Sequence, residues 1–251
     1  DHAAPRPSST LLHMALQSRL FALIFRLASI ALIATGLVRL MGLFGGGTAA
    51  WAAFTFYTTQ STVLCLVWMA ALAVRTARDM ARGGPRGNAL TWPRAGAAGM
   101  MAITVTMLIY LVVLAPSAFV QEGEGYRPFT LTDDLIHIIT PCLVIADWFM
   151  FAPKGRLRWF EPLYWIIPPW TYLLWAFTWP LLGGNFGEGR RYPYPFADPT
   201  QANAAGVPQG WDGVAVQILI LTVALDAFGF LYVVADKLLA RAARKRAERS
   251  G

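Results

Sequence analysis

The chain has 251 residues, of which 56% are hydrophobic and only 14% are charged, and its formal net charge is +7. A soluble domain carries about a quarter of its residues as charges, so this composition excludes an ordinary soluble enzyme and predicts a polytopic membrane protein. The basic residues lie mainly in short loops and a C-terminal tail, which favours a membrane-topology signal over a nucleic-acid-binding face.

We predict an all-α fold with six transmembrane helices, because a hydrocarbon core of about 30 Å needs roughly 20 apolar residues per helical span. The sequence contains six such segments, at 19–43, 50–74, 97–120, 133–151, 159–182 and 213–239. We expect residues 1–18 to form a disordered cytoplasmic lead-in, residues 19–240 the membrane domain, and residues 241–251 a basic cytoplasmic tail.

The loop charges predict the orientation of these spans, because Lys and Arg near span ends stay on the cytoplasmic side. Arginines dominate the loop between the second and third spans, and basic residues also fill the loop after the fourth span and the tail. The opposite loops are richer in acidic residues. Both termini are therefore predicted to face the cytoplasm. High Ala and Arg usage is compatible with a GC-rich bacterial genome, and hence with a bacterial inner membrane.

A polar stripe interrupts the second predicted span. In FTFYTTQSTVLC, residues 54–65, four threonines follow the i, i+3, i+4, i+7 spacing that a helix places on one face: Thr55, Thr58, Thr59 and Thr62. Threonines in membrane helices more often bond to the carbonyl one turn back or join two helices. The functional interpretation is a hydroxyl nucleophile, which requires a positioned base.

The fourth predicted span supplies a candidate base. His137 is the only histidine of the predicted membrane domain, so a multi-histidine metal site within one chain is excluded, and we expect neither a metal nor a cofactor. Pro141, four residues later, is expected to kink the span beside the imidazole. The predicted orientation places Thr58 and His137 in the same outer half of the bilayer. A hydrogen-bonded interior histidine is the structural alternative.

Ionisable residues deeper in the spans form a second set. Arg26, Asp147 and Asp226 each carry an insertion cost of about 2.5 to 3.5 kcal/mol, so each needs a partner or a purpose. We expect the three side chains to neutralise one another and to hold the first, fourth and sixth spans in register. A proton or ion relay is the alternative, but the sequence shows no further groups that continue such a path.

Together these motifs resemble the androgen-induced-protein family of six-span membrane threonine hydrolases, which cleave fatty acid esters of hydroxy fatty acids. FYTTQSTVL is similar to the Phe-x-Thr segment of that family, HIITPCLVIAD to its histidine followed by a proline and an acid, and YPYPFAD to its Tyr-Pro-Phe-x-acid loop. The resemblance extends over nearly the whole chain. It implies that Thr58 is the nucleophile, although the adjacent Thr59 leaves that assignment open by one position.

The expected function is therefore an intramembrane esterase that acts on fatty-acyl esters. Thr58 would attack the ester carbonyl, His137 would take its proton and return it to the leaving alcohol, and water would hydrolyse the acyl-threonine. Thr59, Gln60 and an amide from Asn185 are the candidate oxyanion donors.

The remaining expected substrate-binding residues are Thr62, Trp51, Tyr192, Tyr194 and Phe196. The four aromatic residues suit an interfacial belt equally well. Beyond the ester substrate, the expected partners are membrane lipids. The alternative function is a non-catalytic lipid-binding or transport protein that uses the same cavity.

Overall fold

The computed structural model describes residues 16–42, 50–89, 91–116, 128–187, 189–200 and 210–250. This part of the chain is helical and contains no strand, apart from one isolated backbone bridge between Ser18 and Arg86. Five helical segments are long and apolar enough to cross a membrane: Arg19–Leu40, Tyr57–Gly83, Pro93–Leu114, Leu131–Phe151 and Gly210–Arg249. The prediction of a helical, multi-pass membrane protein is confirmed. The predicted lead-in lies mostly outside the described residues.

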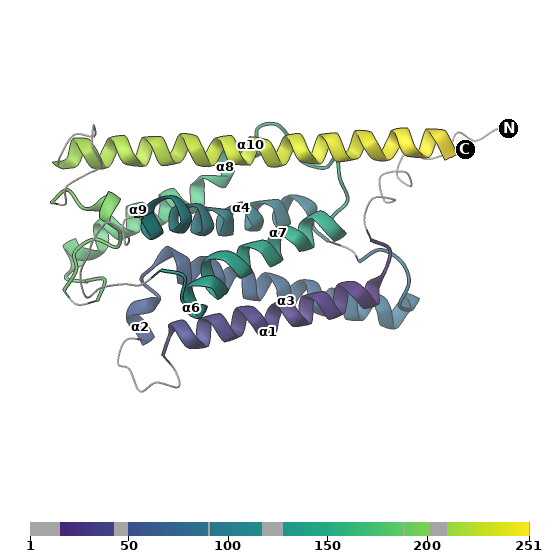
Figure 1. Ribbon diagram of the computed structural model, residues 1–251, viewed down its shortest axis with the longest axis horizontal. Helices are drawn as coiled ribbons and strands as arrows, with labels where there is room; N and C mark the ends of the chain where they lie inside the picture. The colour runs from purple at the N-terminus through teal and green to yellow at the C-terminus, as the bar shows by residue number, and fades with distance from the viewer. Residues whose placement is uncertain are drawn as a thin grey trace.

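The long helices form an elongated bundle (Figure 1). α1 (Arg19–Leu40) packs along α3 (Tyr57–Gly83), and α4 (Pro93–Ile109) contacts both α3 and α7 (Thr140–Phe151). α10 (Gly210–Ser250) covers the opposite side of the bundle from α1. α1 begins and α10 ends at the same end of the bundle, so the chain crosses its length an even number of times.

A break divides the second predicted span, which the sequence pattern presents as one helix over 50–74. α2 (Ala50–Ala53) stops before Phe54, and α3 begins at Tyr57. The Thr55 hydroxyl and backbone N–H both donate to the Ala52 carbonyl, at 2.6 and 3.1 Å, and the Gln60 amide donates to the Phe54 carbonyl at 3.0 Å. These bonds close a turn. Thr58 consequently lies in the first turn of α3 rather than in mid-helix.

Two π-helical segments widen the next two spans. η2 (Tyr110–Leu114) continues α4, and η3 (Asp134–Ile139) joins α6 (Leu131–Asp133) to α7. Pro141 has no N–H to give the His137 carbonyl, while the Thr140 backbone N–H and hydroxyl both reach the Leu135 carbonyl. The kink expected at the proline is therefore a widened turn. Single π-helical turns inside α-helices are frequent at functional sites.

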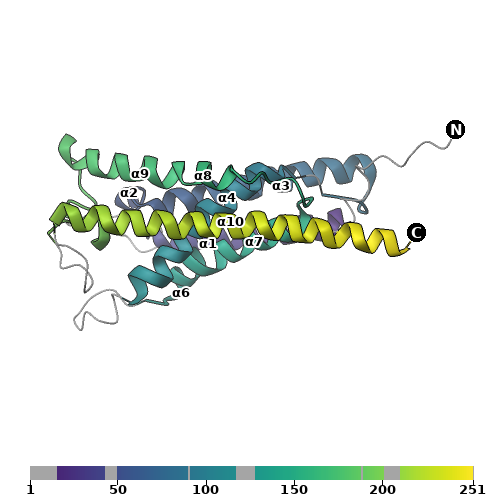
Figure 2. The same ribbon diagram turned by 90° about the horizontal axis from the view of Figure 1, so that it is seen from above.

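Prolines divide the fifth predicted span, 159–182, into short pieces. α8 (Glu161–Trp165) ends at Ile166, and α9 (Ile167–Thr178) follows with prolines in its first turn. A 3-10 turn, η4 (Trp179–Leu182), completes the segment. Pro168 and Pro169 have no backbone N–H to donate to the last carbonyls of α8. The two helices are therefore separated at Ile166 instead of forming one continuous helix. Figure 2 shows α8 and α9 in line along one edge of the bundle.

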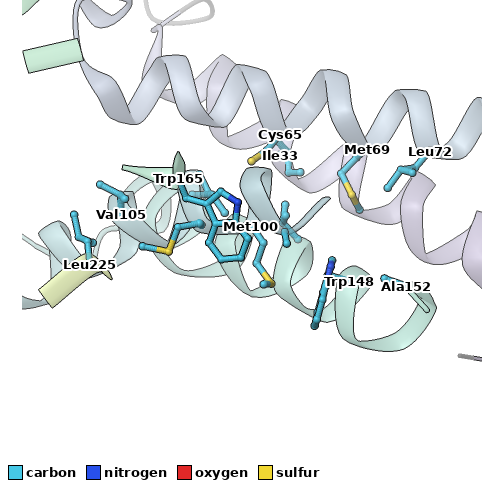
Figure 3. Packing of buried hydrophobic residues seen from close by; sticks show 14 of the residues in the cluster. Ile33, Cys65, Met69, Leu72, Met100, Val105, Trp148, Ala152, Trp165 and Leu225 are labelled. Carbon is cyan, nitrogen blue, oxygen red and sulfur yellow. The ribbon is translucent and has the colours of Figure 1, made fainter. Parts of the chain in front are cut away.

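The core lies between α1, α3, α4 and α7, with contributions from α8 and α10 (Figure 3). Ile33, Met69, Met100 and Trp148 meet there, and the first three side chains are fully buried. α10 contributes little to this core. Only 17% of the residues in its most apolar stretch are buried, against 50% in the third and fourth spanning segments. Its 41 residues measure roughly 60 Å, so its basic end extends past the bundle as a continuous helix (Figure 1).

Buried charges form a pair rather than the expected trio. Arg26 Nε lies 2.7 Å from Asp147 Oδ1, and Nη2 lies 3.3 Å from Oδ2. Arg26 Nη1 also donates to the Thr76 hydroxyl and to the Leu72 carbonyl. Asp226 takes no part, and its Oδ1 has no hydrogen-bond partner among the described residues. The expectation for Asp226 is wrong because α10 packs against α8 and α4, across the bundle from α1.

Candidate functional site

Thr58 lines a small, partly open cavity with a volume of about 60 Å³, which we call the internal cavity. The cavity lies between α3, the α4–η2 segment, α9 and α10. Its walls are mostly aliphatic and aromatic, and polar atoms come from Thr58, Thr106, Thr222 and a few tyrosines. Apolar walls with a few polar groups are typical of small-ligand sites, although this volume is well below the several hundred Å³ of a cavity that encloses a whole ligand. The wall chemistry suits an acyl chain with one polar end.

The loop between η4 and α10 borders the cavity beside Thr58. Tyr194, just before the short turn η5 (Pro195–Ala197), lines the cavity, and so does Phe196. The Tyr194 hydroxyl lies beside Thr58, Tyr172 and the backbone at the start of α3, whose polar groups oppose the effect of burial on its pKa. Burial is the largest influence and raises the pKa of Tyr194, so its hydroxyl remains protonated. This tyrosine therefore lies against the first turn of α3, where backbone amides have no partner within the helix.

Replacing Tyr194 by phenylalanine is expected to lower the free energy of unfolding by about 1 kcal/mol, because the polar groups at Thr58, Tyr172 and the start of α3 lose a buried polar neighbour. Thermal unfolding in detergent measures the change. Tyr192→Phe is the matched control, since the Tyr192 ring packs against Phe177 and Trp211. An equal decrease in the free energy of unfolding of Tyr194→Phe and Tyr192→Phe would contradict a specific role for the Tyr194 hydroxyl at the start of α3.

His137 lies in a different environment. Its ring stacks on Tyr110 with centroids 4.2 Å apart and planes 13° apart. Nδ1 is 3.1 Å from the Asp133 carbonyl, so we assign the proton to Nδ1 and the lone pair to Nε2. The side chain is largely buried, with 8% of the residue exposed. This tautomer suits a general base as well as an interior histidine.

Thr58 and His137 are related through the α4–η2 segment, which borders the cavity and contacts His137. The hydroxyls of Ser61 and Thr106 meet at 2.7 Å and set the register of antiparallel α3 and α4. About one turn outward from that pair lie Thr58 on α3 and Tyr110 at the start of η2. Tyr110 stacks on His137, whereas its neighbour Ile109 lines the cavity with Thr58. His137 is not among the lining residues of that cavity.

The other threonines of the stripe have separate roles. Thr62 donates to the Thr58 carbonyl at 2.7 Å, one turn back along α3. Thr59 is 1% exposed and does not line the cavity. Gln60 is exposed on the bundle surface and closes the turn before α3. Of the stripe, Thr58 alone has a side chain in this cavity.

The remaining candidates from the outer segments are not gathered at Thr58. Asn185 shapes its own loop, since its Oδ1 accepts from the Gly187 N–H and its carbonyl accepts from the Trp179 indole. Tyr192 packs in an aromatic cluster away from the cavity wall. The backbone of Trp51 belongs to α2, and its side chain lies outside the described residues.

Sequence reasoning missed Tyr57 and Tyr172, which line the cavity on either side of Thr58. Their rings meet edge to face, with centroids 5.4 Å apart. The available signal was a tyrosine within an apolar span, because a buried phenol needs a hydrogen-bond partner.

Within the described ranges, no three His, Cys, Asp or Glu residues come together as metal ligands. Comparisons of the chain with family models, with curated proteins and with solved structures found no match.

Proposed function

We propose that the protein is an intramembrane hydrolase of lipid esters, with Thr58 as the nucleophile and the apolar cavity as the acyl-chain site. The observation that carries this proposal is the position of Thr58, which places a hydroxyl and a helix N-terminus at the wall of an otherwise apolar cavity. The resemblance of three motifs to a family of membrane threonine hydrolases supports the same chemistry.

In this proposal, Thr58 Oγ1 attacks the ester carbonyl, and the first-turn amides of α3 receive the oxyanion once Tyr194 moves aside. Helix N-termini favour negative charge, and preorganised N–H donors stabilise such an intermediate. His137 takes the hydroxyl proton and returns it to the leaving alcohol, and water then releases the acid from the acyl-threonine. Because Tyr110 stands beside His137, this transfer requires a rearrangement of η2 when substrate binds.

We also propose that α8, α9 and η4 together make a sixth crossing and that both termini face the cytoplasm. The end of the bundle where α1 begins and α10 ends carries the arginine-rich end of α3, the basic loop 152–158 and the basic end of α10. This distribution supports a cytoplasmic location for that end. A bacterial inner membrane is the location that we propose, with membrane lipids as the only other partners.

A fluorophosphonate probe tests the nucleophile. We expect intact-mass measurement to show a single covalent adduct on the detergent-purified wild type and on Thr59→Ala, but none on Thr58→Ala or His137→Ala. Thr59 is the matched control because it is the adjacent threonine and its side chain lies outside the cavity. A folded wild type without an adduct, or an adduct that survives Thr58→Ala, would contradict the assignment.

A second function, lipid binding or transport without hydrolysis, is favoured by one observation: His137 stacks on Tyr110 and does not line the cavity. In that case the protein retains a co-purified acyl lipid in native mass spectra and forms no fluorophosphonate adduct.

A further inference from the structure

A second hollow lies on the surface of the bundle between α3, α4 and α9. Its volume is about 620 Å³, and it is more open than the internal cavity. Leu64 and Ile167, on opposite walls, are 52% and 53% exposed. We call this hollow the lateral groove. It follows the apolar segments of α3 and α4, so in a membrane its open side meets the acyl chains of the bilayer.

The lateral groove and the internal cavity share a wall. Tyr57 and Tyr172 line both hollows. The Tyr57 hydroxyl donates to the Ala102 carbonyl at 3.1 Å, and the Tyr172 hydroxyl donates to the Thr55 carbonyl at 3.0 Å. Adjacent prolines of α9 extend this wall, since Pro168 faces the groove and Pro169 faces the cavity. Only side chains therefore separate bilayer lipid from the space beside Thr58.

We propose that the lateral groove is the entrance through which a lipid acyl chain passes from the bilayer into the internal cavity, with Tyr57 and Tyr172 as its gate. This inference rests on the proposed function in that the cavity is taken as the acyl-chain site. The competing route enters past the loop that carries Tyr194 and Phe196, two residues that line the cavity. A chain that uses that route must also leave the bilayer and expose its methylene groups to water, whereas a chain in the groove never does.

The polar groups of the groove fit the same occupant. Gln60, Ser61 and Thr171 lie among otherwise apolar lining residues, where they can meet the oxygens of an ester or carboxyl group. The lining residues of the groove carry no charge, so an anionic headgroup is not what this surface selects. The occupant that matches is a bilayer lipid with a carboxyl or ester group on an alkyl chain.

A photoactivatable lipid tests the route. The full chain is reconstituted in phosphatidylcholine vesicles, palmitic acid with a diazirine in its chain is added, and samples are illuminated at successive times. Crosslinked residues are mapped by mass spectrometry. In the wild type we expect crosslinks in the lateral groove first and in the cavity, at Ile109, Leu221 or Leu225, afterwards.

Thr171→Trp fills the groove from α9 and is expected to lengthen the half-time of the cavity crosslinks. Leu64→Trp fills it from α3 and should act in the same direction if the first variant misfolds. Thr178→Trp is the matched control: Thr178 is also exposed, lies two turns further along the same face of α9, and does not line the groove.

Two results separate the entrance from the proposed function. Unchanged cavity labelling in both groove variants, or an equal delay in Thr178→Trp, would overturn the entrance while the cavity keeps its role as acyl-chain site. A wild type that shows no cavity crosslinks at any time would contradict that role itself.

Discussion

Asp147→Ala is expected to lower the free energy of unfolding by about 3 to 5 kcal/mol, because it leaves Arg26 as a buried charge without its carboxylate. The Arg26 side chain is fully buried, and two of its nitrogens bond to Asp147. The Thr76 hydroxyl and the Leu72 carbonyl would remain as partners, but neither carries a compensating charge. Unfolding in mixed micelles with increasing dodecyl sulfate, followed by tryptophan fluorescence, measures the loss.

The double variant Arg26→Met/Asp147→Leu provides the control for this prediction. Replacing a buried ion pair by apolar residues of similar volume is often neutral or stabilising, so most of the lost stability should return. The double variant should also keep its fluorophosphonate adduct, because the pair lies away from the Thr58 cavity. Loss of the adduct in a stable double variant would favour an ion or proton relay over a structural pair.

The apolar segments could be predicted from the sequence because hydropathy reports the lipid-facing and core residues directly. The break before α3 could not, since Thr55 and Gln60 produce it by bonding to carbonyls that a regular helix would have used itself. The division of α8 from α9 had a visible signal in Pro168 and Pro169. A proline in the sequence predicts that the helix is interrupted, but the packing of neighbouring segments determines whether the helix bends or breaks there.

The sequence predicts how far along their helices Thr58 and His137 lie. It does not predict which neighbouring helix each side chain faces. Counting residues from span ends places Thr58 and His137 in the same half of the bilayer, and the contact between Ser61 and Thr106 sets the register of α3 against α4. Which side chains each residue meets depends on tertiary packing. Ile109 lines the cavity with Thr58, whereas Tyr110 stacks on His137.

The capping of α3 by Tyr194 was also beyond the sequence pattern. The YPYPFAD motif marks an aromatic loop, but its contact with Tyr57 and Thr58 joins segments more than 130 residues apart. The proposed hydrolase thus depends on residues from three separate elements: Thr58 at the start of α3, Tyr194 in a loop and His137 in the π-helical segment η3.

Lys154 lies in the loop after α7, where it is 2% exposed. Its ammonium donates to the carbonyls of Trp148 and Ala152, at 2.8 and 2.6 Å, and lies 4.2 Å from the centroid of the Trp148 ring. Asp236 of α10 binds the same loop by accepting the N–H groups of Gly155 and Leu157. Burial is the largest influence on this amine, and it lowers the pKa of Lys154 from 10.5 to about 8.

The depressed pKa of Lys154 predicts a stability that rises with pH between about 8 and 10.5. In this window the unfolded chain still binds the proton that the folded protein has lost, so the free energy of unfolding increases by about 3 kcal/mol in total. Below pH 8 both states are protonated, and the group adds no slope. Lys154→Met removes the titrating amine. When both proteins are unfolded in detergent, the free energy of unfolding of the wild type should therefore rise relative to that of the variant between pH 8 and 10.5. Parallel pH curves for the two proteins would show that Lys154 titrates normally and that its burial costs the folded state nothing.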